Sequence, residues 1–337
     1  MKKVSVIIPC FNATKYLPKC FMSLVQQTIG IGQIELIFVD DASTDDSSTW
    51  NMLQEFERAY PESIMILKLE ENMRQGGARN VALQYATGEY IAFVDADDFV
   101  SENFLLETYE KAKESDADII QFEYFYYTDR LGAVDSGRNI TPEVIKISSV
   151  SDRKKFLISE KITYGCWNKL YRHDLLKTAH TAYAEHVIYE EPLFVYPLLY
   201  FADKIVISND VYYYYRQNDA GTMRNDMRQE ETLKMHANVQ LAVWNFMKNT
   251  PFFQKYYDEI KLYFLHTYLY ETLYFAKLRG FQPSYSFYKE LEKTVITEVP
   301  DYEESTYSAL IPKQMELYRM IGEGMTEEKF GGYWERL

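Results

Sequence analysis

The chain has 337 residues, of which 47% are hydrophobic, and this is enough to bury a sizeable core in two domains or in one domain with a long appendage. Its formal net charge of −14 excludes the basic surface that nucleic-acid binding requires, whereas a nucleotide could still be met by a metal ion, backbone N–H groups and a few Arg or Lys side chains. Three cysteines, sparse and odd in number, predict reduced thiols in a cytosolic protein.

The start of the chain carries no predicted targeting segment. Met1, Lys2 and Lys3 precede a short apolar run, and Pro9 and Asn12 would interrupt the hydrophobic region of a signal peptide. The sequence also has no stretch of roughly 18 apolar residues, the length that spans a bilayer. Together with the sparse cysteines, this predicts a cytoplasmic location.

The first third of the chain alternates short apolar runs with amphipathic segments. The run 3–8 predicts a buried strand, and the segment 15–28 predicts an amphipathic helix. Ser43 is expected to cap the next helix, with Asp45 and Asp46 in its first turn. Further strands are expected at 34–39, 64–69 and 90–94, and further helices at 43–60, 74–86 and 101–115. This alternation predicts an α/β fold with a doubly wound, mostly parallel sheet.

The pattern changes at about residue 227. Before that point, strands are expected at 118–127, 166–171 and 204–215, a hairpin or excursion at 128–146, and helices at 151–160, 173–179 and 187–200. After it, helical periodicity continues through 228–248, 252–279, 284–297, 306–321 and 326–335. The sequence therefore predicts an α/β domain over residues 1–225 and a helical C-terminal region over residues 226–337.

Three carboxylates, those of Asp95, Asp97 and Asp98, follow directly on the apolar run 90–94. Ligands of open α/β sheets bind at the carboxyl ends of the strands, and a hard divalent cation prefers oxygen ligands. A Mg²⁺ or Mn²⁺ ion held there would carry the phosphates of a nucleotide. An Asp-rich turn that caps a helix is the alternative.

Polar residues follow two other expected strands as well. Phe11 and Asn12 come after the first strand, and Asp40 and Asp41 end the second. By the right-handed crossover rule, these strand ends share one edge of the sheet with the acidic turn at 95–98. The sequence therefore predicts that these groups converge in space.

Four motifs occur in the order and with the spacing of a known family. They are Val6-Ile-Ile-Pro-Cys-Phe-Asn12, Val39-Asp-Asp-Ala-Ser-Thr-Asp45, Arg74-Gln-Gly-Gly-Ala-Arg-Asn80 and Val94-Asp-Ala-Asp-Asp98. On these motifs the chain resembles the inverting glycosyltransferases of family 2, which have the GT-A fold. The resemblance is strong over about 3–125 and weaker over 160–225, and it implies a nucleotide-binding half, 1–125, and an acceptor half, 126–225.

The resemblance implies a pocket for the nucleotide of a nucleotide-diphosphate sugar. Pro9, Phe11 and Asn12 would line this pocket. Asp40 or Asp41 would accept a hydrogen bond from the base, and because a carboxylate selects an N–H group such as that of uracil, a UDP-sugar is the expected donor. An Asp turn that stabilises the start of a helix is the alternative for this pair.

The same resemblance assigns the diphosphate and the metal. Arg79 and Asn80 would meet the nucleotide near the start of a helix, with helix capping and a surface cation as the alternative. Within Asp95-Ala96-Asp97, Asp95 and Ala96 would contact the nucleotide sugar, with Asp95 at the ribose or the donor sugar. Asp97, with Asp95 beside it, would hold a Mn²⁺ or Mg²⁺ ion that stabilises the departing diphosphate.

Inverting transfer needs one general base that takes the proton of the acceptor hydroxyl. The family carries this base on an acidic pair at the start of a helix, and Glu190 and Glu191 before Pro192 occupy that place. Glu191 matches the base, where the family commonly has Asp, and Glu190 is the fallback. Acidic residues also suit a first helical turn, so a capping role is the alternative.

Two further segments resemble the family. In 165–171, Trp167 is expected to stack on an acceptor sugar and Lys169 to approach a phosphate, with a core position as the alternative for Trp167. In 215–223, which resembles a loop that closes over the donor, Arg216 is expected to contact the diphosphate.

These expectations describe a metal-assisted hexosyl- or N-acetylhexosaminyltransferase. It would move a sugar from a nucleotide donor to a saccharide or lipid-linked acceptor, with inversion, in the synthesis of bacterial cell-surface polysaccharide. A lipid-linked acceptor would bring the chain to the inner face of the cell membrane. The C-terminal helices would supply acceptor contacts, a homodimer interface or a membrane-facing surface, or they would form a bundle with no direct role.

Two other functions stay open. A sugar nucleotidyltransferase shares a related fold and metal, but it normally has a Gly-rich basic loop where this chain has Pro9-Cys-Phe-Asn12. A homologue that binds a nucleotide sugar without turnover is the other, and Glu191 in place of Asp gives this reading its support.

Overall fold

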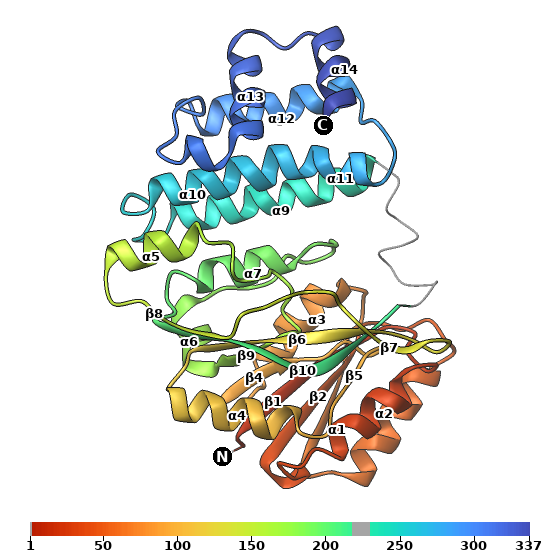
Figure 1. The fold of residues 1–337 in the computed structure, drawn as a ribbon. Coiled ribbons are helices and arrows are strands. Elements are labelled where there is room, and N and C mark those ends of the chain that lie inside the picture. Colours follow the sequence, from red (N-terminus) through yellow and green to blue (C-terminus); the bar gives the residue numbers. More distant parts are fainter. Residues whose placement is uncertain (1, 218–229) are drawn as a thin grey trace. The chain divides into compact units, whose positions relative to one another are not determined.

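The computed structural model of the chain describes residues 2–217 and 230–337. They belong to two compact units, Met1–Asp219 and Ala220–Leu337 (Figure 1). In the part of the chain that is described, the first unit is an α/β domain and the second is built of helices. The expected order of an α/β region followed by a helical region is therefore observed, whereas the functional halves 1–125 and 126–225 stay a prediction.

Four parallel strands form the first half of the sheet in the first unit. In space their order is β3 (Ile64–Lys68), β2 (Ile34–Asp40), β1 (Val4–Cys10) and β4 (Tyr90–Phe93). Every residue of β1 is buried, because helices cover both faces of the sheet. The continuous apolar runs of the sequence reflect this burial on both sides.

The second half of the sheet is mixed. β9 (Lys169–Arg172) lies antiparallel between β4 and β6 (Ile119–Thr128), and β10 (Lys204–Arg216) is parallel to β6. The short strands β5 (Phe99–Val100), β7 (Gly132–Asp135) and β8 (Glu143–Lys146) pair antiparallel to β6 or β10. Because β9 runs antiparallel to both of its neighbours, β6 and β10 run in the same direction as β1, β2 and β4. These five strands therefore end at the same edge of the sheet.

Helices cover the two faces of this sheet (Figure 1). On one face lie α1 (Leu17–Val25), α2 (Ser48–Ala59) and α4 (Phe104–Ser115), and on the other lie α3 (Arg74–Leu83), α6 (His173–Ala179) and α7 (Glu191–Leu198), while α5 (Val150–Leu157) precedes β9. One continuous core fills the first face, with Leu17, Phe21 and Leu24 of α1 packed against β1 and β2. This packing fixes the strand ends that carry the polar motifs.

The second helix begins later than the sequence predicts. The prediction of a cap at Ser43 is wrong, because α2 begins at Ser48. The Ser43 hydroxyl instead accepts a hydrogen bond from the backbone N–H of Asn12 at 3.0 Å. Asp45 performs the capping function, since its carboxylate accepts from the backbone N–H of Thr49 at 3.1 Å.

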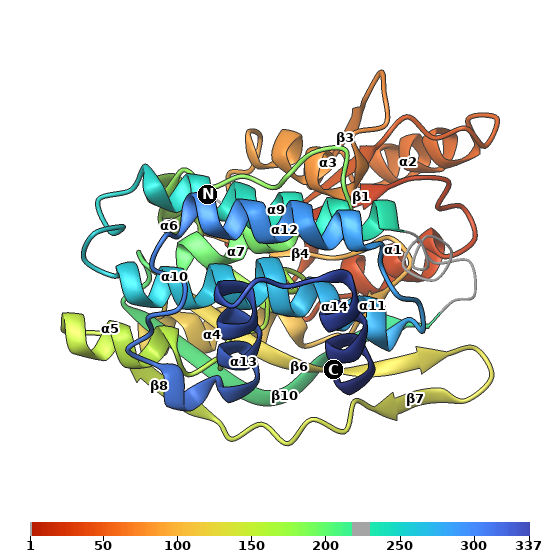
Figure 2. The same cartoon turned by 90° about the horizontal axis from the view of Figure 1, so that it is seen from above.

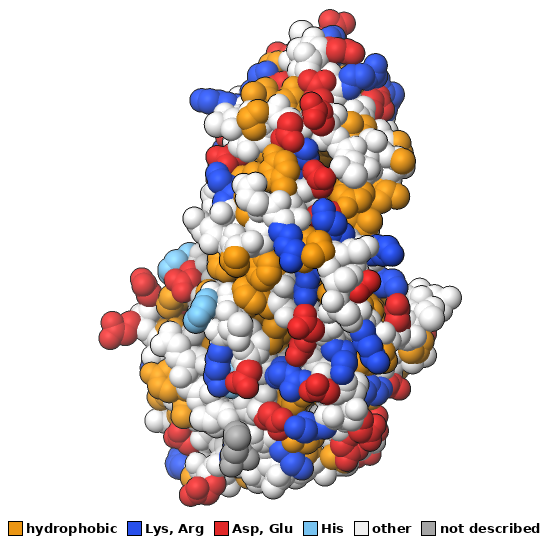
Figure 3. Space-filling view, turned by 90° about the vertical axis from the view of Figure 1, so that its left-hand side faces the viewer, with side chains coloured by type: hydrophobic (Ala, Val, Ile, Leu, Met, Phe, Trp, Pro, Cys, Tyr) orange, Lys and Arg blue, Asp and Glu red, His pale blue; other side chains and the backbone are white. Residues whose placement is uncertain are grey.

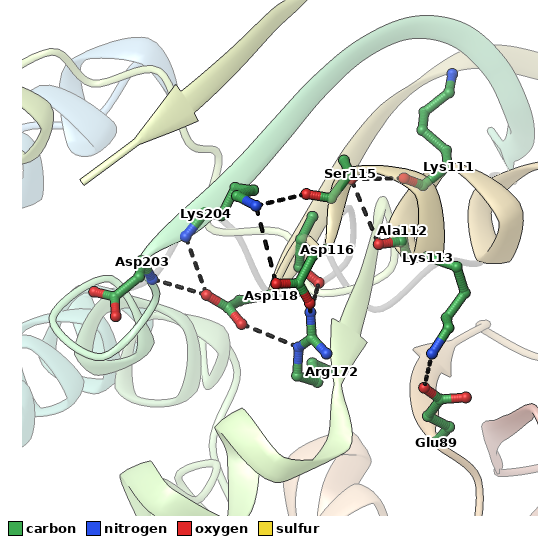
Figure 4. A network of polar contacts seen from close by, with 11 residues as sticks. Glu89, Lys111, Ala112, Lys113, Ser115, Asp116, Asp118, Arg172, Asp203 and Lys204 are labelled. Atoms are coloured by element: carbon green, nitrogen blue, oxygen red, sulfur yellow. Dashed lines mark hydrogen bonds and ion pairs between the residues drawn. The ribbon is translucent and has the colours of Figure 1, made fainter. Parts of the chain in front are cut away.

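The opposite edge of the sheet is closed by a network of polar contacts (Figure 4). The carboxylate of Asp118 accepts from the backbone N–H groups of Asp203 and Lys204 at 2.8 and 3.0 Å. Arg172 donates to Asp118 at 3.1 Å and to Asp116 at 2.6 Å. These groups line a hollow of about 400 Å³. These groups pair with one another at the edge opposite the strand ends that carry the polar motifs. The network therefore joins β6, β9 and β10 and is not our candidate site.

In the second unit, α9 (Glu230–Lys248) and α12 (Tyr285–Glu298) pack against a central helix (Figures 1 and 2). That helix consists of α10 (Tyr257–Phe264), a π-helical segment (Leu265–Glu271) and α11 (Thr272–Leu278). The helices α13 (Pro312–Gly322) and α14 (Glu327–Arg336) follow. Many of the tyrosines and phenylalanines of the sequence are core residues here, as Tyr288, Tyr318 and Phe264 show.

On the face that Figure 3 shows, acidic and basic side chains are interspersed, and hydrophobic side chains are exposed in small groups. Among residues 2–217 and 230–337, the helices include none of the length and apolar character that a bilayer crossing needs.

Candidate active site

Two loops meet at the carboxyl edge of the sheet, one after β1 and one after β2. The side-chain amide of Asn12 donates to Thr44 Oγ1 at 3.2 Å, and its oxygen accepts from the backbone N–H of Thr44 at 2.8 Å. Pro9 is buried within β1, whereas the ring of Phe11 is 48% exposed next to this junction. The predicted nucleotide-pocket residues Pro9, Phe11 and Asn12 therefore lie together, with one aromatic ring open to a ligand.

Asp40 and Asp41 are both buried at the end of β2. Asp40 Oδ1 accepts from the backbone N–H of Ser43 at 3.1 Å, and Asp41 Oδ1 accepts from that of Met73 at 2.7 Å. Burial raises the pKa of Asp41. Each carboxyl group thus holds a loop, Asp40 the loop before α2 and Asp41 the turn into α3, in addition to any contact with a base.

The acidic turn after β4 is fixed against the end of β10. The backbone N–H of Asp95 donates to the hydroxyl of Tyr213 at 3.1 Å, and this hydroxyl donates to Asp98 Oδ2 at 2.7 Å. The backbone N–H of Arg216 donates to Asp98 Oδ1 at 2.7 Å. Asp98 is fully enclosed, and burial, followed by the charge of Asp97, raises its pKa. Asp98 therefore anchors the turn, while Asp95 and Asp97 are left at its partly exposed side.

Arg79 joins the two acidic motifs of the chain. Its Nη2 atom lies 2.7 Å from Asp95 Oδ1, and its Nη1 atom lies 2.6 Å from Glu190 Oε1. The guanidinium is 1% exposed, and the carboxylates of Asp95 and Glu190 are 13% and 7% exposed. A single buried cation thus holds the turn after β4 next to the start of α7.

The rest of α3 forms a close-packed surface for the segment that leads into α7. A Cβ atom at Gly76 would lie 2.3 Å from the carbonyl oxygen of Ala184 and 2.9 Å from Cγ of Glu190. The amide of Asn80 donates to the carbonyl of Tyr183 at 3.0 Å and accepts from its N–H at 2.8 Å. Asn80, which we expected at the nucleotide, therefore uses both ends of its amide to hold the segment that carries the acidic pair.

The two glutamates at the start of α7 differ in environment. Glu190 is buried and bound to Arg79, whereas Glu191 is half-buried and accepts from the backbone N–H of Cys166. Burial, followed by the charge of Glu190, raises the pKa of Glu191 to about 8. A carboxylate with so high a pKa is suited to remove a proton from a hydroxyl group.

Trp167 lies among tyrosines next to this pair. Its ring is half-buried, stacked on Tyr215 with 5.3 Å between ring centroids and edge-on to Tyr124 at 4.7 Å. The backbone N–H of its neighbour Cys166 donates the hydrogen bond that Glu191 accepts. The predicted acceptor residue therefore directly follows the residue that contacts the candidate base, and its ring belongs to a cluster of aromatic rings.

Lys169 and Arg216 make contacts within the protein. Lys169 is fully buried, and burial lowers its pKa to about 7. The guanidinium of Arg216 is 4% exposed, donates from Nε to the carbonyl of Asp97 at 2.8 Å, and pairs with Asp129. Arg216 thus braces the acidic turn, and the residues 218–223 of the expected closing loop lie outside the described part of the chain.

Few ligands are available for a divalent cation at the acidic turn. Within the described ranges 2–217 and 230–337, His, Cys, Asp and Glu residues form no group of three or more that could hold a metal ion. The acidic turn therefore offers the carboxylates of Asp97 and Asp95, and that of Asp95 is already bound to Arg79. This fits an ion such as Mg²⁺ that takes one or two carboxylates and completes its shell with substrate phosphates and water.

Sequence reasoning missed several residues of the site. Tyr213 and the backbone of Cys166 position the acidic groups, and Gly76 allows the close approach of α3 and the segment before α7. The paired glycines of Gly76-Gly77 were a signal for such a close approach. Tyr213 carries no such signal, because it is one of four consecutive tyrosines, 212–215, near the end of the strand.

Comparison with known proteins gives a family and relatives. Residues 5–179, just over half of the chain, match Glycosyl transferase family 2. A poly(ribitol-phosphate) beta-glucosyltransferase of Bacillus spizizenii is 31% identical over 215 residues, which cover 63% of this chain and 32% of that protein. Glycosyltransferase GlyG of Streptococcus pneumoniae is 31% identical over 230 residues, which cover 66% of this chain and 73% of GlyG.

A solved structure is similar over nearly the whole chain. S. aureus TarS 1–349 in complex with UDP-GlcNAc aligns with a TM-score of 0.72 and 22% identity, over 98% of this chain and 89% of that one. This likeness confirms the expected GT-A fold with its helical C-terminal region. The chain spans only about a third of the length of the Bacillus relative.

Proposed function

Because this chain belongs to glycosyl transferase family 2, we propose that it transfers a sugar from a nucleotide-diphosphate donor to an acceptor hydroxyl with inversion at the anomeric carbon. Support comes from the site at the carboxyl edge of the sheet, where open α/β folds bind their ligands. The observation that carries the proposal is the Arg79 bridge, since it joins the acidic turn of Asp95 to the acidic pair of Glu190.

Each residue has a role in this reaction. Glu191 takes the proton of the acceptor hydroxyl, and the acceptor oxygen forms a bond to the anomeric carbon. The bond between that carbon and the diphosphate oxygen breaks, and its electron pair leaves with the nucleoside diphosphate. Arg79 keeps Glu190 occupied and holds it beside Asp95, so Glu191 alone is left to act as the base.

In this proposal a metal ion acts on the leaving group, the nucleoside diphosphate. Asp97, with Asp95 beside it, would hold a Mn²⁺ or Mg²⁺ ion at the donor diphosphate. When bound, the ion stabilises the negative charge that develops on the departing diphosphate. Asp98 and Arg216 keep the backbone of this turn in place.

The donor is a UDP-sugar with a hexosyl or N-acetylhexosaminyl group. A buried carboxylate at Asp40 or Asp41 suits the N–H group of uracil, and the exposed ring of Phe11 can stack on the base. The solved relative of similar fold binds UDP-GlcNAc. Pro9 and Asn12 form the wall of this pocket and the link to the next loop.

The acceptor is a cell-surface polymer, either a saccharide or a polyol phosphate. The relatives of this chain include poly(ribitol-phosphate) glycosyltransferases, and Trp167 beside Glu191 offers an aromatic surface for a sugar or polyol. A homodimer and a peripheral contact with the membrane stay predictions.

A thermal-shift panel tests the proposal. UDP, UDP-glucose, UDP-GlcNAc and GDP-mannose are added with and without MnCl₂, and a donor at 100 times its Kd should stabilise the fold by about 2.7 kcal/mol. UDP-sugars are expected to raise Tm only with the cation. No shift with any nucleotide sugar, or equal shifts without the cation, would contradict the proposal.

A further inference from the structure

Lys169 is a buried cation that the mechanism above does not use. It has no exposed surface, and its Nζ atom lies 3.0 Å from Thr163 Oγ1, 2.6 Å from the carbonyl of Gly165 and 2.8 Å from Asn168 Oδ1. An ammonium group has three N–H donors, so each has an acceptor within the protein. This set of contacts leaves no donor for the phosphate contact that we expected of Lys169.

All three acceptors belong to one segment, 163–168. The same segment is tied to β6, where the side-chain oxygen of Gln121 accepts from the backbone N–H of Thr163 at 2.9 Å and from its hydroxyl at 3.1 Å. The amide of Asn168 donates to the carbonyl of Phe122 at 3.2 Å. Lys169 is thus the central donor of a buried polar network that holds the segment on the sheet.

This segment carries the two groups that lie next to the acidic pair. The backbone N–H of Cys166 donates a hydrogen bond to Glu191, and the ring of Trp167 stacks on that of Tyr215. Lys169 therefore holds the segment whose backbone contacts the candidate base through Cys166. A shift of the segment would move the Cys166 N–H group and the Trp167 ring relative to Glu191 together.

A buried charge is costly in itself. The charged or titratable groups that face Lys169 are Cys166, Glu191, Arg138 and Glu123, and none of them accepts a hydrogen bond from its Nζ atom. The charge is tolerated only when it is hydrogen-bonded, and the hydrogen bonds of Lys169 all go to one segment. The three acceptors in one segment therefore point to a role in geometry.

We propose that Lys169 is a positioning residue for sugar transfer, which fixes the segment 163–168 so that the Cys166 N–H and Trp167 are held in register with Glu191 and the acceptor. The inference rests on the proposed function. It assigns Lys169 to the transfer step and the acceptor side of the site, and it takes Lys169 out of donor binding.

Two pairs of variants test this role. Lys169→Met removes the ammonium and keeps the length of the side chain, while Thr163→Val removes one acceptor and keeps its shape, with Thr163→Ser as the matched control that retains the hydroxyl. The measurements are the Kd for UDP with MnCl₂, and kcat and KM for UDP release from UDP-glucose and UDP-GlcNAc with a ribitol-phosphate polymer as acceptor. Amide hydrogen exchange of residues 161–168 is followed in parallel.

We expect Lys169→Met to lower kcat by about 10-fold or more, because small misplacements of reacting groups have effects of this size. The Kd for UDP should stay within about twofold, as positioning on the acceptor side predicts. Thr163→Val should lower kcat in the same direction by a smaller factor, and Thr163→Ser should behave like the wild type. Exchange in 161–168 should be faster in Lys169→Met and Thr163→Val.

Several results would overturn the inference. One is a kcat of Lys169→Met within twofold of that of the wild type. Another is a loss of UDP affinity by the same factor as the loss of kcat, which would show that Lys169 contacts the phosphate. If Lys169→Met does not fold, equal kcat values for Thr163→Val and Thr163→Ser overturn it. Should the wild type release no UDP under any condition, the proposed function fails, and unchanged exchange in 161–168 would separately refute the positioning.

Discussion

Arg79 and Glu190 form a buried ion pair, with 2.6 Å between Nη1 and Oε1, and this pair distinguishes two neighbouring glutamates chemically. Glu190 has a permanent cationic partner, whereas the pKa of Glu191 is raised by burial and by the charge of Glu190 itself. The same arginine reaches Asp95. One side chain therefore joins both acidic motifs and, in the reaction proposed above, leaves Glu191 as the base.

Glu191→Gln should abolish transfer and leave UDP binding nearly unchanged, because a base acts only in the chemical step. The measurements are UDP release with acceptor and UDP affinity by calorimetry. Glu190→Gln is the matched variant. It weakens the buried pair with Arg79 and should lower Tm, while some transfer is retained. Loss of transfer in Glu190→Gln with activity retained in Glu191→Gln would reverse the assignment of the base.

The rate of transfer should increase as the pH rises through about 8, because Glu191 acts only when it is deprotonated and its pKa is about 8. A pH profile of UDP release checks this, and a rate that is already constant above pH 6 would contradict it.

The same carboxyl group has a consequence for stability. Its pKa in the folded state lies above that of Glu in the unfolded chain. Its contribution to the free energy of unfolding is therefore present below the unfolded pKa of about 4.3 and is lost as the pH rises through about 8. Glu191→Gln has no such charge. Its Tm should therefore exceed that of the wild type above pH 8, and the difference should vanish near pH 4. A constant difference at all pH values would show that Glu191 does not titrate in this range.

Asp97→Asn should remove most of the cation-dependent affinity for UDP, since a carboxylate ligand of the ion is lost. Titration of UDP with and without MnCl₂ measures this, and we expect a loss of at least about 10-fold in the presence of the cation. Asp174→Asn, at an exposed position on α6, is the control and should bind like the wild type. Unchanged cation-dependent affinity in Asp97→Asn would exclude Asp97 as the metal ligand.

Gly76→Ala should lower both activity and stability, because its Cβ atom would meet the carbonyl of Ala184 at 2.3 Å and push away the segment that carries Glu190. Overpacking of this kind costs about 1–3 kcal/mol. Gly32→Ala is the control, since no atom lies within 4 Å of its Cβ position. Thermal unfolding and UDP release measure the effect, and equal behaviour of the two variants would contradict this packing.

The convergence of the strand ends was predictable from the sequence, because parallel strands joined by helices place their carboxyl ends at one edge. The order of motifs then led to the prediction of Asp95 and Asp97 as site residues, and the acidic pair before Pro192 led to that of Glu191. The direction of β9 was not predictable, since a short apolar run looks the same whether it pairs parallel or antiparallel. Its antiparallel pairing makes the sheet mixed.

The partners of individual side chains were beyond the reach of the sequence. Arg79 meets Glu190 across more than a hundred positions of chain, and Asn80 and Lys169 turn inward to the backbone although their types suit a phosphate or a base equally well. Only the tertiary packing of α3 and of the segment 163–168 decides between these uses. The prediction that Ser43 caps α2 was wrong for a similar reason, because the Ser43 hydroxyl accepts a hydrogen bond from Asn12 of another loop.

The most direct test of the account is a crystal of the protein grown with UDP and MnCl₂, in which anomalous scattering locates manganese. We predict one manganese peak bonded to the carboxylate of Asp97 and to the diphosphate, with uracil between Phe11 and the loop after β2. A manganese peak away from Asp97, or UDP bound outside this edge of the sheet, would contradict the account.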